Sequence, residues 1–224
     1  MIGGSKGIGH AILRELDQDN NIYVASRSNE NLGQTNSRHL PFDVLTDDLD
    51  WSKLPEELHG FVYCPGSINL KPFKILSANN FVEDMQLNFF GLVRVVKEVI
   101  PKMVDGSSMV FFSTVAVGTG MPYHASIAAA KGAIEGFAKA LAAEYAPKIR
   151  INVIAPSLTD TPLAGRLLNN DRKREEMSKR HPLKRVGRAE DIANSAVFLL
   201  DEKSSWMTGQ VIRTDGGIST IKID

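Results

Sequence analysis

Four glycines lie within the first nine residues, and an amphipathic helix pattern follows them directly. The run reads Gly3-Gly4-Ser5-Lys6-Gly7-Ile8-Gly9, and apolar residues then recur at helical spacing over positions 11–16. Glycine allows a tight turn and a close approach of the backbone, and the free N–H groups of a helix N-terminus attract an anion. A strand pattern at 22–26 completes a mononucleotide-binding unit. The run therefore predicts a pyrophosphate cradle, with a plain structural turn as the alternative.

The end of the strand at 22–26 indicates which dinucleotide such a cradle would hold. An acidic side chain at this point would bind the ribose 2′-hydroxyl, whereas the sequence reads Ala25-Ser26-Arg27-Ser28 and its first carboxylate is Glu30. Arg27 and Lys6 together can neutralise a 2′-phosphate. We therefore expect NADP(H) rather than NAD; the alternative is that both are solvated surface cations.

Strand and helix patterns alternate along the whole chain, which is typical of a parallel sheet covered on both faces. We expect an α/β fold of the Rossmann type, a doubly wound parallel sheet with helices on both faces. Strands are predicted at 22–26, 40–44, 60–64, 109–113, 149–155 and 211–214, and helices at 7–18, 78–103, 123–146 and 189–200. Only Met1 and Ile2 precede the glycine turn, so the first strand is expected to be truncated.

The composition favours one compact domain over residues 1–224 and a small-molecule partner. Lys plus Arg equals Asp plus Glu at 26 each, so no field of one sign attracts nucleic acid or a membrane surface. The only cysteine, Cys64, has no intramolecular partner, which favours a reducing, cytoplasmic location. We assign no residue to a metal. The polar segment 162–187 is interpreted as a mobile helical flap over the substrate or, alternatively, as a solvated surface helix.

Further short motifs follow the glycine run in a characteristic order. They are Asp43-Val44, Tyr63-Cys64-Pro65-Gly66, Asn88 within Leu87–Gly91, Ser113-Thr114-Val115-Ala116, Lys131–Phe137, Pro156–Thr161, Arg185–Ile192, Thr208-Gly209-Gln210 and Asp215-Gly216-Gly217. Together they resemble the short-chain dehydrogenase/reductase family, especially its 3-oxoacyl-carrier-protein reductase-like members, over essentially the whole chain.

The resemblance implies roles for particular residues. Cofactor-binding residues would be Gly3, Ser5, Lys6, Gly7, Ile8, Gly9, Arg27, Asp43, Val44, Gly66, Lys131 and Thr161. Asn88 and Lys131 would belong to the catalytic set, and Thr114 would take the place of the catalytic serine. Ile2 and the Tyr63-Cys64-Pro65 segment replace polar residues that tie the first strand to the fourth in the family, and Ser157 replaces a glycine.

The most consequential departure is Ile127, which stands four residues before Lys131, where the family has its catalytic tyrosine. That tyrosine protonates the carbonyl oxygen, and general acid help of this kind contributes on the order of 10²- to 10⁴-fold. Tyr123 lies a further four residues back, so on one helix it would share the face of Ile127 and Lys131. Tyr123 is therefore the candidate replacement acid, although it could simply pack against the flap. His124 and water are the other donors considered.

Two functions follow from these expectations. The first is an NADP(H)-dependent oxidoreductase acting on a carbonyl or alcohol substrate with an atypical active site. The second is a catalytically silent NADP(H)-binding sensor or scaffold, and a dehydratase or epimerase is a third, minor alternative because a fold does not fix a reaction. A homodimer or homotetramer is also expected, through helices at 88–103 and 123–146. Small residues on the latter, Gly132, Ala133, Gly136 and Ala140, would permit close helix packing, or could pack on the sheet instead.

Overall fold

The computed structural model describes residues 1–222 and has a parallel sheet at its centre. The strands are β1 (Tyr23–Ser26), β2 (Arg38–Pro41), β3 (Leu58–Tyr63), β4 (Met103–Phe112), β5 (Ile149–Pro156) and β8 (Val211–Thr214), with a small separate pair β6 (Thr159–Asp160) and β7 (Gly187–Arg188). The main helices are α1 (Gly7–Leu16), α2 (Ala78–Met85), α3 (Gly91–Val99), α4 (Val115–Thr119), α5 (Ala125–Tyr145), α6 (Asp171–Arg180) and α7 (Ala189–Leu200). The expected Rossmann-type architecture is confirmed.

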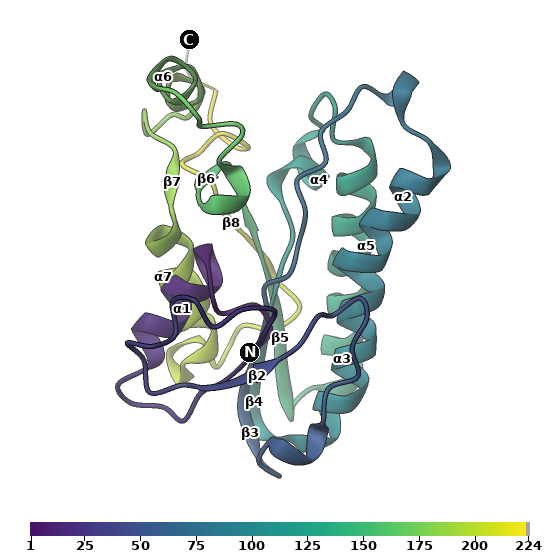
Figure 1. The fold of residues 1–224 in the computed structure, drawn as a ribbon, viewed down its shortest axis with the longest axis vertical. Coiled ribbons are helices and arrows are strands. Elements are labelled where there is room, and N and C mark those ends of the chain that lie inside the picture. Colours follow the sequence, from purple (N-terminus) through teal and green to yellow (C-terminus); the bar gives the residue numbers. More distant parts are fainter. Residues whose placement is uncertain (223–224) are drawn as a thin grey trace.

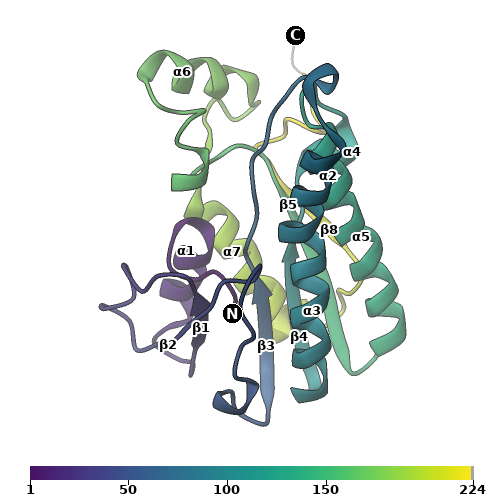
Figure 2. The same cartoon turned by 45° about the vertical axis from the view of Figure 1, so that its right-hand side comes forward.

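Helices cover both faces of the sheet, as Figures 1 and 2 show. On one face α1 and α7 pack against the strands, and Ile12 and Ile192 are fully enclosed there with Val110 of β4. On the other face α3 and α5 pack, so that Ile134 meets Phe111 in a second apolar cluster. Strand β4 is therefore apolar on both sides over its last four residues, which explains its continuous rather than alternating pattern.

A single residue occupies the place of the first strand. Ile2 bridges Ala25 of β1 and Tyr63 of β3, both in parallel register. The N–H of Ile2 donates to Val62 O at 2.9 Å and its carbonyl accepts from Cys64 N at 3.0 Å. On the other side, Gly3 N donates to Ala25 O at 2.8 Å and Ala25 N to Met1 O at 2.9 Å. The sheet thus runs β2–β1–Ile2–β3–β4–β5–β8.

Two predicted helices differ from the observed ones. The segment 78–103 is divided by a π-helical turn over Gln86–Phe90 that separates α2 from α3. The helix predicted from 123 begins only at Ala125, because Tyr123 has a positive φ of 71° and His124 is the N-cap residue. The expectation that Tyr123 shares a helical face with Lys131 is therefore wrong.

The segment 162–187 lies between β6 and β7, which pair with each other and close it at its base. Its helix, α6, has no fully buried residue, and the partly buried Met177 packs from it against an apolar cluster. The segment is held by Ala164, Leu168 and Val186, which form this small apolar cluster beneath it. Among residues 1–222, no helix has the length and apolar character needed to cross a membrane.

Candidate functional site

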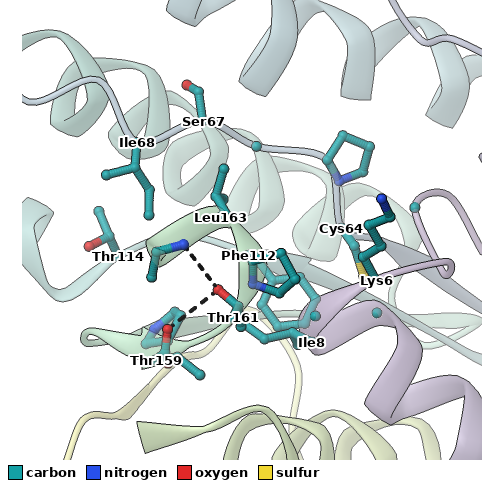
Figure 3. Close-up of a pocket in the computed structure, with 18 of the residues that line it drawn as sticks. Lys6, Ile8, Cys64, Ser67, Ile68, Phe112, Thr114, Thr159, Thr161 and Leu163 are labelled. Carbon is teal, nitrogen blue, oxygen red and sulfur yellow. Dashed lines mark hydrogen bonds between the residues drawn. The ribbon is translucent and has the colours of Figure 1, made fainter. Parts of the chain in front are cut away.

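A cavity of about 910 Å³ opens at the carboxyl ends of the strands. Its walls come from the glycine turn, the ends of β1, β4 and β5, the start of α5 and the segment after β6. This edge is where ligands bind in open α/β sheets, since helix N-termini and connecting loops converge there. Figure 3 shows part of the lining, with Lys6 and Ile8 on one side and Ser67, Ile68 and Thr114 across from them.

Every residue that the sequence proposed for cofactor binding lines this one cavity. The set is Gly3, Ser5, Lys6, Gly7, Ile8, Gly9, Arg27, Asp43, Val44, Gly66, Lys131 and Thr161. Of the four proposed catalytic residues, Thr114 and Lys131 line it, whereas Asn88 and Tyr123 do not. The structure therefore brings thirteen of the fifteen proposed residues together in one cavity and leaves Asn88 and Tyr123 outside its lining.

The glycine turn fits a pyrophosphate group. Gly7 opens α1 with a positive φ of 55°, a conformation that side-chain-bearing residues rarely adopt. A Cβ atom at Gly9 would overlap the carbonyl oxygen of Gly3, so the helix can pack this closely on the turn only with glycine there. No side chain caps the N-terminus of α1, and its first turn carries no acidic residue. The free N–H groups thus face the cavity with no competing negative charge in that turn.

The two cations expected to bind a 2′-phosphate, Lys6 in the glycine turn and Arg27 directly after β1, differ in their surroundings. Lys6 forms an ion pair with Glu30, with 2.7 Å between Nζ and Oε2. Arg27 is exposed and, within residues 1–222, has no ion pair. The hydrogen bond from Lys6 and the positive charge of Lys6 lower the pKa of the Glu30 carboxyl group. Arg27 is therefore free to bind an anion, while Lys6 must first leave Glu30.

Lys131 lies deep in the cavity and is almost completely buried. Its ammonium group donates to the carbonyl oxygen of Phe112 at 2.9 Å, which ties α5 to the end of β4. Burial lowers the pKa of Lys131 to about 8, and the charges of Cys64 and Asp84 oppose this shift. Burial likewise raises the pKa of the Cys64 thiol to about 12. Lys131 is thus a buried cation that can lose its proton in mildly alkaline solution.

The two threonines proposed from the sequence, Thr114 and Thr161, have their hydroxyl groups held by neighbouring backbone. Thr114 is the N-cap of α4 and accepts from Ala116 N at 3.3 Å. Thr161 accepts from Ala164 N and donates to Thr159 O, both at 3.4 Å, as the dashed lines in Figure 3 show. The Thr114 hydroxyl therefore keeps its proton available for a ligand.

A buried carboxylate behind the cavity was not anticipated from the sequence. Asp84 is 1% exposed and accepts hydrogen bonds from Ser67 Oγ at 2.7 Å, Asn69 Nδ2 at 2.6 Å and Ser126 Oγ at 2.6 Å. Asn88 lies beside it and donates to Ser67 Oγ at 3.0 Å. Asn88 thus reaches the cavity only through Ser67, which lines it. The available signal was the four-residue spacing of Asp84 and Asn88, which places both on one helical face.

The start of α5 carries no tyrosine into the cavity. Ile127 lines the cavity and is 5% exposed, so an aliphatic side chain fills the position one turn before Lys131. Tyr123 is 58% exposed and lies outside the lining, because the chain turns sharply before the helix starts. His124 does line the cavity, with its Nδ1 2.7 Å from the carbonyl oxygen of Pro122.

The comparisons with known proteins agree with this geometry. A family model described as enoyl-(acyl carrier protein) reductase matches residues 3–219. The chain is 31% identical over 239 residues to the 3-oxoacyl-[acyl-carrier-protein] reductase of Chlamydia trachomatis, covering 98% of this chain and 96% of that protein. The chain belongs to the short-chain dehydrogenase/reductase family.

Further similarities extend across the family. The chain is 32% identical over 243 residues to a tropinone reductase homolog of Arabidopsis thaliana, covering 98% of this chain and 91% of that protein. The solved structure of ligand-free aldohexose dehydrogenase from Thermoplasma acidophilum aligns with a TM-score of 0.89 at 26% identity, over 100% of this chain and 95% of that one. As a short-chain dehydrogenase/reductase, the chain is an oxidoreductase of a family that uses a nicotinamide cofactor.

One departure from this dehydrogenase/reductase pattern, Tyr63, is accommodated by a hydrogen bond from its hydroxyl group to the backbone. The buried hydroxyl of Tyr63 donates to Leu87 O at 3.0 Å, at the π-helical turn that carries Asn88. A Cβ atom at Gly91 would lie 2.8 Å from this hydroxyl oxygen, so the tyrosine fits only because residue 91 is glycine. Tyr63 therefore joins the end of β3 to the π-helical turn between α2 and α3.

A second departure of this short-chain dehydrogenase/reductase places a hydroxyl beside a buried histidine. Ser157, which directly follows β5, has its Oγ 2.9 Å from Nε2 of His181. His181 is 3% exposed, and its Nδ1 lies 2.9 Å from the carbonyl oxygen of Met177. Ser157 and His181 both line the cavity. The sequence showed Ser157 as a substitution but gave no sign of its partner, which lies 24 residues further along the chain.

Proposed function

We propose that the protein is an NADP(H)-dependent oxidoreductase acting on a carbonyl or alcohol substrate, with an atypical active site in which Ile127 takes the tyrosine's position. The observation that carries the proposal is the continuity of one cavity, which joins the glycine turn and Arg27 to Thr114 and Lys131. The α1 N-terminus would hold the phosphates of a dinucleotide bound in this cavity, and Lys131 would lie beside its reactive end. The remaining volume, next to the segment 162–187, is left for the substrate.

When bound, NADPH supplies the hydride that reduces a carbonyl carbon. The residues of the chain then provide binding and orientation. The backbone at Gly7 holds the pyrophosphate, and Lys131 presents a cation fixed by its bond to Phe112 O. Thr114 offers a hydroxyl that orients the carbonyl group. Asn88, fixed by Asp84, positions Ser67 at the cavity wall.

The preference for NADP(H) rests on Arg27 and on the lack of a carboxylate at the end of β1. Replacing Arg27 by Ala should weaken NADPH binding roughly ten- to a hundred-fold, the range for a lost charge-assisted hydrogen bond, and should leave NADH binding unchanged. Fluorescence titration with both nucleotides measures this. Arg14→Ala, an exposed arginine on α1 that does not line the cavity, is the matched control. Equal loss for both nucleotides would refute the assignment.

The catalytically silent sensor is the second candidate, and the aliphatic Ile127 is the observation that favours it. Turnover separates the two functions. The screen should include 3-oxoacyl thioesters, tropinone and aldohexoses, the compound classes for which the similar proteins are named. NADPH oxidation above background with any of them supports the oxidoreductase. Tight NADPH binding without oxidation across the screen supports the sensor.

We also propose that the protein forms a homodimer or homotetramer through α5. Gly136 and Ala140 are exposed on α5, and a Cβ atom at Gly136 would meet nothing within 4 Å. The alternative that these small residues pack on the sheet is therefore wrong for Gly136. Light scattering should show more than one chain per particle, and Gly136→Arg should yield a monomer. A wild-type monomer would refute the proposal.

A further inference from the structure

The cavity contains one histidine–hydroxyl pair that the functions assigned above do not use. His181 ends α6, and its ring is enclosed between Ser157 and the loop after β8, where a Cβ atom at Gly216 would lie 3.6 Å from His181 Cδ2. Nδ1 can only donate to the carbonyl oxygen of Met177, because a carbonyl has no proton to give. In the neutral ring Nε2 is therefore the acceptor, and the Ser157 hydroxyl donates to it.

Charging the imidazole reverses the direction of this hydrogen bond. Both ring nitrogens of a cationic histidine are donors, so Nε2–H then donates to Ser157 Oγ. The hydroxyl proton of Ser157 is released from His181 and can turn toward another acceptor. Because Ser157 lines the cavity, that acceptor is a ligand in the cavity.

We propose that Ser157 and His181 form the proton relay of this enzyme, with Ser157 as the catalytic donor to the substrate oxygen and His181 as its proton source. The proposal rests on the oxidoreductase function stated above. It assigns the role that Ile127 cannot fill to Ser157 at the end of β5, which lines the same cavity. Strand register supports the location, since Phe112 of β4 pairs with Ile154 of β5, so that Thr114 and Ser157 extend from neighbouring strand ends.

The relay is balanced in atoms and charge. As the carbonyl carbon gains a hydride, its oxygen takes the proton of Ser157 Oγ–H, forming an O–H bond. Ser157 Oγ takes the proton of His181 Nε2–H at the same time, so the serine ends unchanged and His181 ends neutral. Solvent then restores the proton to the imidazole. Alcohol oxidation runs the same transfers in reverse.

Other charged groups near His181 are already engaged or are themselves cationic. On its own segment these groups are Arg180 and Lys184, and on neighbouring elements they are Asp215 after β8 and Asp160 in β6. The carboxylate of Asp215 accepts from the N–H groups of Gly217 and Ser219. The carboxylate of Asp160 is paired with Arg174. His181 thus has Ser157 as its only side-chain hydrogen-bond partner within residues 1–222.

His124 is the competing donor, and its geometry is less specific. Its ring is bonded through Nδ1 to the carbonyl oxygen of Pro122, two residues earlier in the same turn. His124 is only partly buried and holds no hydroxyl group in place. A protonated histidine that is buried and passes its proton through a fixed hydroxyl is the better-organised donor. His124→Gln is therefore the matched control for the variants of the pair.

Turnover of the full-length protein with NADPH and a reducible carbonyl compound tests the relay. Ser157→Ala and His181→Gln should each lower kcat by roughly 10²- to 10⁴-fold, the usual contribution of a general acid. NADPH affinity should not change. Ser157→Thr keeps the hydroxyl and should retain most activity, and His124→Gln should retain it fully. Loss of activity in His124→Gln with full activity in Ser157→Ala would overturn the proposal.

A rescue experiment separates a chemical role from a structural one. Ile127→Tyr places a phenol one turn from Lys131 and should restore turnover in the Ser157→Ala background, because it supplies the missing acid by another route. A variant that had lost only the anchoring of α6 would gain nothing from a tyrosine on α5. If Ile127→Tyr fails to raise turnover in Ser157→Ala, the relay is refuted.

Nuclear magnetic resonance of the histidine rings provides a readout independent of turnover. In its neutral form the His181 ring should carry its proton on Nδ1, and Ser157→Ala should shift the Nε2 resonance by removing its donor. The opposite tautomer would refute the relay. If the wild-type protein binds NADPH but reduces no carbonyl compound, the proposed oxidoreductase function fails. If it reduces one and Ser157→Ala reduces it equally well, only the relay fails.

Discussion

Lys131 donates its hydrogen bond to Phe112 O across 2.9 Å, in the part of the cavity where Ile127 offers no polar partner. The buried ammonium group is thus satisfied by the backbone of β4 rather than by a neighbour on its own helix. This contact keeps the lysine in place without the tyrosine. It also means that the charge of Lys131 is maintained against burial by only a few opposing groups, Cys64 and Asp84.

The stability of the protein should therefore depend on pH through Lys131. Burial lowers the pKa of Lys131 from 10.5 to about 8, so the folded protein releases this proton at lower pH than the unfolded chain. The contribution of Lys131 to the free energy of unfolding should rise by about 3 kcal/mol as pH increases through that interval, and the cost of the buried charge should be fully present below it. Lys131→Met should lack this rise in urea unfolding curves. Lys139→Met, on the exposed side of α5, should keep it.

The glycine turn should tolerate no side chain at position 9. Gly9→Ala forces a methyl group against the Gly3 carbonyl, and we expect a loss of about 1–3 kcal/mol in unfolding free energy together with weaker NADPH binding. Gly33→Ala is the control, because a Cβ atom there meets nothing within 4 Å. Similar stabilities for the two variants would show that the turn is less tightly packed than described.

Asp84 should be required for folding stability. Asp84→Ala leaves three donors, on Ser67, Asn69 and Ser126, without their acceptor, which should lower the unfolding free energy by about 2–5 kcal/mol. Thermal and denaturant unfolding measure the loss. Asp19→Ala, on the exposed turn after α1, should change neither measurement. A small effect at Asp84 would mean that water replaces the carboxylate.

Glu30 should weaken NADPH binding by occupying Lys6. Glu30→Gln breaks the ion pair and frees the ammonium group for a 2′-phosphate, so NADPH affinity should rise a few-fold while NADH affinity stays the same. The gain should diminish at high salt. Glu15→Gln, an exposed carboxylate on α1 outside the cavity, serves as the control in the same titration. A fall in NADPH affinity would show that Glu30 itself contacts the ribose.

Local patterns predicted the frame of the site well. The glycine run, the strand ends and the position of Lys131 depend on residues close in sequence, and the structure gathers them in one cavity. Helix boundaries were less accessible. Tyr123 fits the helical spacing, yet its positive φ places it before the helix. The spacing of apolar residues does not reveal this backbone conformation.

Side-chain pairs formed by distant segments could not be predicted. Ser126 and Asp84 are separated by 42 residues and meet only because α2 packs on α5. The partner of Ser157 likewise lies on the segment 162–187, whose composition indicated a mobile flap or a solvated helix but no partner for Ser157. Such contacts depend on how whole elements pack, and a single sequence gives their candidates without their pairing.

Because Ile2 alone bridges β1 and β3, the β1–β2 ribbon is joined to the rest of the sheet by few backbone hydrogen bonds. Two backbone hydrogen bonds on the β3 side and three on the β1 side, one of them from the Met1 ammonium group to Tyr23 O, join the β1–β2 ribbon to the broad β3–β4–β5–β8 sheet. Amide protons of the ribbon should thus exchange with solvent sooner than those of β4, because opening it breaks few contacts. A nucleotide that contacts both Arg27 and Lys131 would link the β1–β2 ribbon to the larger sheet. Saturation with NADPH should therefore slow amide hydrogen exchange most strongly in the ribbon.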